Sequence, residues 1–114
     1  MTSIDWYQQE ALILAYMFVH PNEIVRKDLN EHHFRDSDTR LMYMLMKANY
    51  KYNNNQGING HEVIDGMAKN PRFRKLLEDT DLTTHVLWSN PDYVVSKAVF
   101  EWYVEIQKNK EKVK

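Results

Sequence analysis

The apolar residues of this chain recur at spacings of three and four, the period of an α-helix, along almost its whole length. In the first stretch, residues 6–18, they cover most of a helical surface, so we expect a central helix buried on several sides. Asp5 is placed to cap this helix. The pair His20-Pro21 ends it, because a residue before proline avoids the helical region.

Two further helices are predicted before residue 53. Pro21 opens a short one, and its inward-facing residues would be Ile24, Val25 and Leu29. Asp36 and Asp38 then place capping side chains and negative charge at the start of a long helix. Its apolar stripe consists of Leu41, Met42, Tyr43, Met44, Leu45, Met46 and Ala48. The turn-forming sequence 53–57 ends it.

The second half continues the helical pattern with one ambiguous segment. Asn59 and Glu62 have the spacing of a capping box and open a helix that stops near Asn70-Pro71. A short fifth helix would carry Phe73, Leu76 and Leu77. The β-branched segment 80–89 fits an extended chain, yet no second strand is available to pair with it. Asn90-Pro91 has the cap-then-proline signature of a last helix, whose apolar residues are Tyr93, Val94, Ala98, Val99, Trp102 and Ile106.

These elements predict an all-α fold, a compact bundle of about six helices of unequal length around a single core. The first and third helices would form its centre and the last would close it. With 114 residues the chain is long enough for one domain, and no linker or internal repeat divides residues 1–114. After Ile106 the sequence turns polar and Lys-rich, so we expect 107–114 to be a frayed tail.

Composition narrows the classes of protein. The net charge of −1 gives no overall field toward nucleic acid or membrane, and the absence of Cys excludes disulfides and thiolate metal sites. The longest apolar run, 11–19, is too short to cross a bilayer, and the N-terminus lacks the pattern of a signal peptide. We therefore expect a cytoplasmic protein that does not contact membranes.

No motif points to catalysis. None of the Ser residues lies in a tight Gly-flanked turn, and Gly57, Gly60 and Gly66 lack the spacing of a phosphate-binding loop. His61 and Asp65 would share a helical face, as two metal ligands could, but an acidic first helical turn explains them as well. The adjacent pair His32-His33 has no third ligand. We predict a non-enzyme with no catalytic residue, metal or cofactor.

Aromatic residues point instead to a binding surface. They are too many, and too widely spaced around their helices, all to fit a small core: Tyr16, Tyr43, Tyr50, Tyr52, Trp88, Tyr93, Trp102 and Tyr103. Tyr, Trp and Met are favoured in protein–protein interfaces. A basic cluster around Arg72 and Arg74 is a weak candidate for phosphate contacts, which Glu78, Asp79 and Asp81 would neutralise.

The order of motifs resembles a known family. The segments are 9–17 (Gln-Glu followed by a Leu-rich helix), His20-Pro21, 33–36 around Phe34, 39–43 and 57–59. They are similar to the N-terminal domain of DnaB-type replicative helicases and to the helicase-binding C-terminal domain of DnaG-type bacterial primases, over residues 9–106. The chain departs from the family at His33, where an acidic residue is usual, and in the insertion 53–55.

The resemblance implies a non-catalytic protein–protein interaction module of bacterial or phage DNA replication, serving helicase–primase association or helicase assembly. Its partners would be the replicative helicase, the primase or both, with DNA reached only indirectly. The chain stops where the family continues into a helical hairpin, so it would be a fragment or a free-standing version, and a monomer or weak dimer. For partner binding we select Arg72, Arg74, Tyr93, Lys97, Trp102 and Tyr103. The alternative is a small helical DNA-binding module, with the helix pair around 59–77 as its nearest match to a helix-turn-helix.

Overall fold

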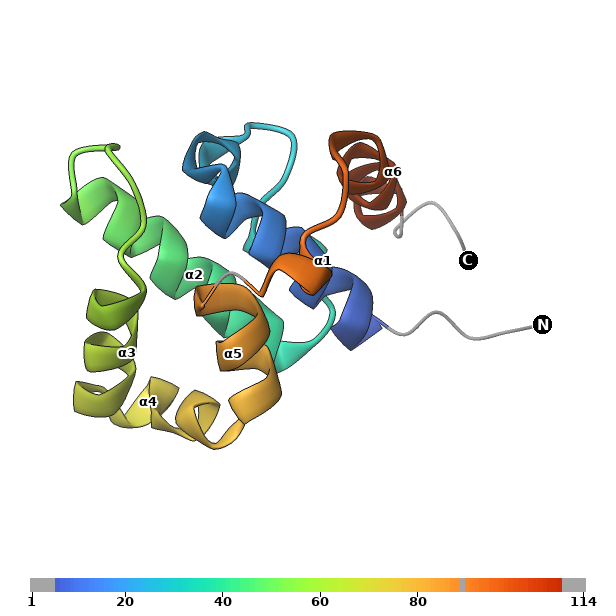
Figure 1. Cartoon of the computed structure of the whole chain (residues 1–114). Coiled ribbons are helices and arrows are strands. Elements are labelled where there is room, and N and C mark those ends of the chain that lie inside the picture. The colour runs from blue at the N-terminus through green and yellow to red at the C-terminus, as the bar shows by residue number, and fades with distance from the viewer. Residues whose placement is uncertain (1–5, 89, 110–114) are drawn as a thin grey trace.

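The computed structural model describes residues 6–88 and 90–109, and every regular element in these ranges is helical (Figure 1). The six α-helices are α1 (Trp6–Val19), α2 (Ser37–Tyr52), α3 (Gly60–Lys69), α4 (Pro71–Arg74), α5 (Thr80–Leu87) and α6 (Lys97–Lys108). Short 3-10 turns occupy Pro21–Val25, Glu31–His33, Lys75–Glu78 and Pro91–Tyr93. The predicted all-α bundle of unequal helices is confirmed.

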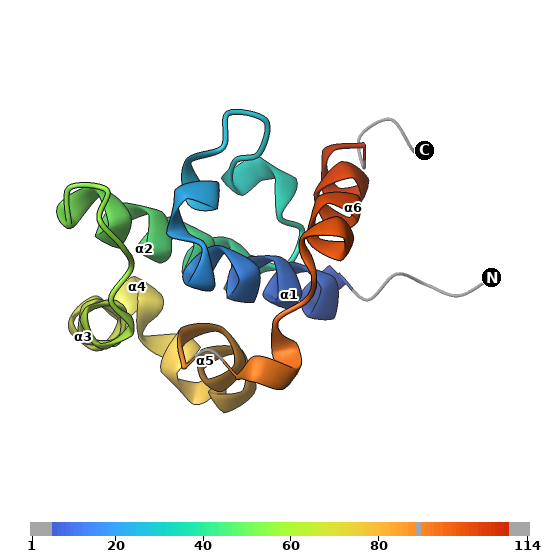
Figure 2. The same cartoon turned by 45° about the horizontal axis from the view of Figure 1, so that its top comes forward.

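Helix α1 runs through the middle of the molecule, as its pattern predicts. It packs against α2, α5 and α6, which flank it on different sides (Figure 2). Ile13, Leu14 and Met17 are completely buried, together with much of the rest of the helix. The three helices around α1 are thus held by one shared core, into which α2 adds Met42 and Met46.

Tyr43 fastens the chain between α1 and α2. Its ring stacks on Phe34 with 4.8 Å between centroids, and both side chains are fully buried. The Tyr43 hydroxyl donates to the carbonyl oxygens of Ile24 (3.3 Å) and Leu29 (3.2 Å), two residues whose side chains are also buried in the core. Burial raises the pKa of Tyr43 to about 12, so the hydroxyl keeps the proton that it donates.

The predicted start and stop signals are found at α2 and α3. The Asp36 carboxylate accepts from the backbone N–H of Thr39 (2.9 Å), and the Asn59 side chain accepts from that of Glu62 (3.1 Å). Helix α2 ends where Asn54 and Asn55 take positive φ values of 57° and 61°, a conformation that Asn tolerates better than most residues.

Four predictions about the elements need correction or completion. Val25 is 40% exposed and does not face inward, whereas Ile24 is buried as predicted; the segment Pro21–Val25 forms a 3-10 turn. The ambiguous segment is helical from Thr80 to Leu87, capped by Asp79 through the N–H of Leu82. Asn90-Pro91 opens only a 3-10 turn, and the last helix begins at Lys97 after its cap, Ser96. The predicted cap Asp5 lies outside the described residues.

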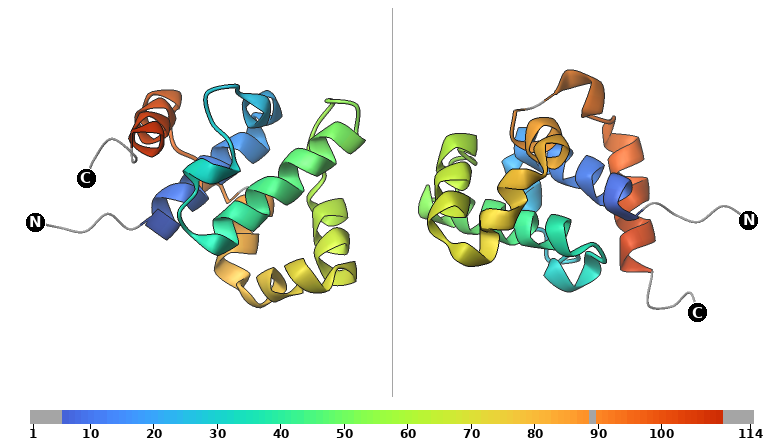
Figure 3. Two further views of the ribbon diagram at one scale, coloured as in Figure 1. Left: turned by 180° about the vertical axis from the view of Figure 1, so that it is seen from behind. Right: turned by 90° about the horizontal axis from the view of Figure 1, so that it is seen from below.

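The frayed tail predicted for 107–114 is wrong at its start. Helix α6 continues through Lys108, and Gln107 is completely buried. Gln107 lies three and seven positions after Val104 and Phe100, so it shares their inward face despite its polarity. Residues 110–114 lie outside the described part of the chain. The start of α1 and the end of α6 meet at one end of the molecule (Figure 3).

None of the helices in the described ranges has both the length and the apolar character required to pass through a bilayer.

Candidate protein-interaction surface

The inner face of α6 is held by aromatic packing against α1. Phe100 and Val104 are completely buried. The ring of Phe100 stacks on that of Tyr16 at 4.1 Å between centroids and 16° between planes. The guanidinium of Arg26 lies over the same Phe100 ring, 5.6 Å from its centroid. Phe100 therefore anchors α6 both to α1 and to the segment after α1, which contains Arg26.

A buried carboxylate joins α1 to the start of α2. Glu10 is fully buried, and its two carboxylate oxygens accept from the backbone N–H groups of Arg35 (2.8 Å) and Asp36 (3.0 Å). It also accepts from the hydroxyl of Thr39 (2.7 Å), in the first turn of α2. A negative side chain at a helix N-terminus interacts favourably with the helix dipole. Glu10 thus fixes the loop and the helix start in one place.

Gln107 extends this polar network to α6. Its amide donates to Glu10 (3.0 Å) and to the carbonyl oxygen of His33, while its own oxygen accepts from the Gln9 amide (2.7 Å). Among the described residues, no buried side-chain nitrogen or oxygen is left without a partner. The buried polar groups are therefore satisfied, as a stable interior requires.

Ion pairs hold one edge of α6. Arg26 pairs with Glu23, Asp28 and Glu101, each at 2.9 Å, and Lys108 pairs with Asp28 at 3.1 Å. Hydrogen bonds from Arg26 are the main reason that the pKa of Asp28 lies well below its usual range; Lys108 adds to this, and partial burial opposes it. These contacts tie the middle and the end of α6 to the segment after α1.

The outer side of α6 carries a second apolar stripe. We call it the outer stripe; its residues are Val99, Trp102, Tyr103 and Ile106. Their spacing of i, i+3, i+4 and i+7 places them along one side of the helix. Trp102 is 63% exposed and its ring stacks on that of Tyr103, 5.6 Å away, while the other three residues are half-buried. This is the pattern by which one amphipathic helix contacts another.

Only two of the six selected residues come together. Trp102 and Tyr103 share the outer stripe. Lys97 is exposed at the start of α6, but five helical positions turn it about 140° away from Trp102. Tyr93 is not on the last helix: it ends the turn Pro91–Tyr93, and its ring stacks on His85 of α5 at 4.2 Å.

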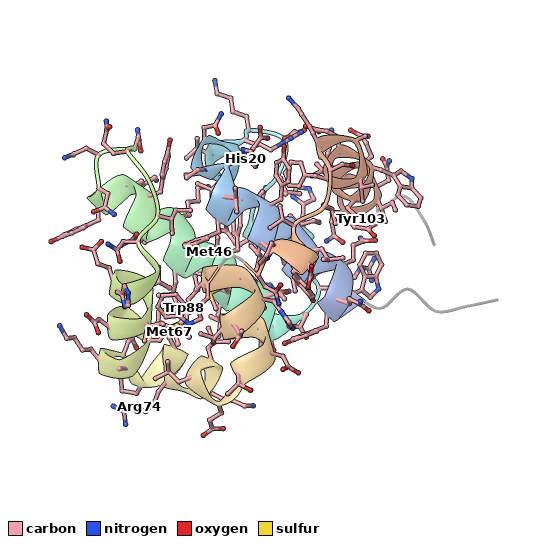
Figure 4. All side chains as sticks on the ribbon, viewed as in Figure 1. His20, Met46, Met67, Arg74, Trp88 and Tyr103 are labelled. Carbon is pink, nitrogen blue, oxygen red and sulfur yellow. The ribbon has the colours of Figure 1, made fainter. Side chains whose placement is uncertain are left out.

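Arg72 and Arg74 lie elsewhere. Both are exposed on α4, and Figure 4 places Arg74 at the opposite side of the molecule from Tyr103. The molecule extends 40 × 27 × 26 Å, so a single partner helix would not touch both regions. The six residues do not make one surface. The sequence pattern predicts which face of each helix is exposed, but it does not predict how the helices lie relative to one another.

The aromatic residues divide between core and surface. Tyr16, Tyr43 and Tyr50 are buried and belong to the core. Tyr52, Trp88 and Trp102 are exposed by 78%, 46% and 63%. Tyr93 and Tyr103 are half-buried against the core. The exposed aromatic side chains therefore lie at separate places on the molecule and do not form one continuous surface.

The histidines have structural contacts. The His33 ring accepts through Nδ1 from the backbone N–H of Asn30 (3.0 Å), and the His61 ring meets Trp88 edge-on at 4.8 Å. In the described ranges no three His, Asp or Glu side chains gather so as to hold a metal ion.

Sequence reasoning missed the buried network of Gln9, Glu10, Thr39 and Gln107. The signal available in the sequence was the helical period, which places Gln107 on the same inward face as Phe100 and Val104.

Comparisons with protein-family models, curated proteins and solved structures find no match to this chain.

Proposed function

We propose that this domain is a non-catalytic protein–protein interaction module of a bacterial or phage DNA replication machinery. Its task would be helicase–primase association or helicase assembly, with the replicative helicase, the primase or both as partners. The observation that carries the interaction role is the outer stripe of α6, where Trp102 is 63% exposed on a helix that is firmly held from behind. Exposed Trp at the centre of an apolar stripe is typical of an interface anchor.

The link to replication rests on the resemblance, and the contacts of Glu10 support it. The residues that Glu10 binds, Arg35, Asp36 and Thr39, lie in two separate motif segments of the resemblance, and Glu10 itself lies in a third. Residues far apart in the sequence that share one buried junction are expected in a fold signature.

The points of departure from the family also have local roles. His33, where the family has an acidic residue, closes the turn before Phe34 through its ring and accepts from Gln107 through its carbonyl. The inserted residues 53–55 form the turn after α2. Both departures are accommodated without loss of the junction at Glu10.

The DNA-binding alternative has less support. Its helix pair would be α3 and the segment 71–78, but only the first four residues of that segment are α-helical and the rest form a 3-10 turn, so it is not one regular recognition helix. Arg72 and Arg74 are nevertheless exposed, so a DNA titration at several salt concentrations belongs beside the protein-binding test.

The test is calorimetric titration of the domain into the replicative helicase of its host, with size-exclusion co-elution. We expect saturable binding, and its stoichiometry per hexamer would separate primase-like docking from helicase-like assembly. Trp102→Ala should weaken binding by at least about tenfold, as expected for an interface anchor. Trp88→Ala removes a second exposed indole, just after α5, and is the matched control that should bind normally.

Two results would count against the proposal. Absence of binding at high micromolar concentration, with a sample whose circular dichroism shows folded helices, would remove the helicase as partner. Equal weakening by both Trp substitutions would remove the outer stripe as the binding surface.

A further inference from the structure

A second candidate surface lies where α2 ends and α3 begins, away from α6 (Figure 1). Two shallow hollows of about 330 and 350 Å³ meet there at Glu62. The first is lined by Asn49, Tyr52, Glu62, Asp65, Gly66 and Lys69. We call this first hollow the α2–α3 groove.

The carboxylate of Glu62 is fixed in the groove. The side-chain amides of Asn49 (3.0 Å) and Asn53 (3.1 Å) both donate to its Oε1. These two hydrogen bonds lower the pKa of Glu62, so the group is ionised at neutral pH. Its Oε2 accepts no hydrogen bond from the described part of the chain. One carboxylate oxygen therefore faces solvent in a defined position.

The amides that hold Glu62 are themselves held. The Asn49 oxygen accepts from the backbone N–H of Asn59 (2.7 Å) and from the Asn53 amide (3.2 Å). Asn59 in turn caps α3 through the N–H of Glu62. The predicted capping box is therefore only half formed. The Asn59 side chain caps α3, but the Asn59 backbone N–H donates to Asn49 and not to Glu62, whose side chain turns toward the groove.

Tyr52 adds an aromatic face beside this carboxylate. It is 78% exposed, the largest exposure among the big hydrophobic residues described, and its ring contacts no other ring or cation in the described ranges. Gly66 leaves the groove open, since a Cβ there would meet nothing within 4 Å. Asp65 supplies a second exposed carboxylate and Lys69 the opposing charge, which leaves the lining net negative.

We propose that the α2–α3 groove binds an arginine side chain of a partner protein. A planar guanidinium can stack on the Tyr52 ring while its N–H groups donate to Glu62 Oε2 and to Asp65. Lysine matches this arrangement less well, because its ammonium is a point charge without a flat face. Nucleic acid is excluded by the same charges, because phosphates would be repelled by both carboxylates.

This inference does not rest on the outer stripe, because the groove is built from α2 and α3 and shares no residue with α6. A domain with both surfaces could contact two partners, or one partner at two points. Either surface can fail its test without affecting the other.

The test uses the ¹⁵N-labelled domain and an alanine-based helical peptide that carries one arginine. We expect saturable NMR shifts at the side-chain amides of Asn49 and Asn53 and at the backbone amide of Gly66. Glu62→Gln, which keeps the backbone N–H that Asn59 caps, should weaken binding about fivefold. Glu78→Gln, at an exposed glutamate next to α5, is the matched control and should bind like the wild type.

Peptide variants test the chemistry of the ligand. Replacement of the arginine by glutamine should abolish the shifts, and lysine should give weaker ones. Tyr52→Ala should reduce the preference for arginine over lysine. The proposal is overturned by absence of shifts at millimolar peptide, by equal affinity of Glu62→Gln, or by shifts of the same size around Asp79 and Asp81.

Discussion

On its inner side α6 buries Phe100, Val104 and Gln107, whereas on its outer side it leaves Trp102 63% exposed. A buried polar contact of the helix is thus inside, where Gln107 binds Glu10, and its largest apolar group is outside. Directional hydrogen bonds fix where a helix lies more narrowly than apolar packing does. The inner face therefore positions α6, and the outer face is available for another molecule.

The inner arrangement carries a large cost that its contacts must offset. Moving a carboxylate such as Glu10 out of water costs several kcal/mol. Its four donors supply compensation, and two of them are backbone N–H groups that need a partner in any case. Such a network is most sensitive to removal of one member, because the others then stay buried without partners.

The largest effect is expected at Glu10. Glu10→Ala should lower the free energy of unfolding by about 3–5 kcal/mol, because the N–H groups of Arg35 and Asp36 and the Thr39 hydroxyl lose their acceptor. Glu10→Gln keeps the shape and one acceptor oxygen, so about 1–3 kcal/mol is expected. Urea denaturation followed by circular dichroism measures both. A loss below about 1 kcal/mol for the alanine variant would contradict the role of the network.

Phe100 comes next in size. Phe100→Leu keeps an apolar group but removes the stack on Tyr16 and the contact with Arg26, so we expect a loss of about 1–3 kcal/mol. Limited proteolysis should also cut near α6 sooner than in the wild type, since the anchor of that helix is weakened. Unchanged stability and cutting would mean that the polar junction alone holds α6.

The helices and their caps could be predicted because they depend on local chemistry. The capping of α2 by Asp36 and of α3 by Asn59 follows from side chains placed within three residues of the groups they bind. The long central helix followed from the apolar surface of 6–18. The start of the last helix was misplaced, because Asn90-Pro91 suits a 3-10 turn as well as an α-helix.

The candidate site was harder to predict because it depends on how helices meet. Trp102 and Tyr103 are neighbours in sequence, and their shared surface was found. Arg72 and Tyr93 were grouped with them on composition alone, whereas α4 and the turn Pro91–Tyr93 lie elsewhere. Glu10 and Gln107 are 97 positions apart, so no local pattern could pair them.

A smaller effect, dependent on pH, is expected from Asp28 at the edge of α6. Its pKa is lower in the folded state than in the unfolded chain, so it adds stability above about pH 4 that is lost as the pH falls further. Asp28→Asn should cost about 1 kcal/mol at pH 7, because the pair is partly exposed. Urea midpoints at pH 7 and pH 3 should therefore differ less in this variant than in the wild type; parallel changes would refute the assignment.

The smallest effect on stability is expected at Trp102, the largest residue of the outer face. Trp102→Ala removes a side chain that stacks on Tyr103 but stays mostly in water, so the free energy of unfolding should change by about 0.5 kcal/mol or less. Urea denaturation beside Glu10→Ala gives the contrast directly. A loss comparable to that of Phe100→Leu would make Trp102 part of the core, and the two faces of α6 would then share one role. Unchanged stability together with weakened helicase binding would assign different roles to the two faces of α6. Polar contacts on the inner face would position the helix, and apolar contacts on the outer face would bind the partner.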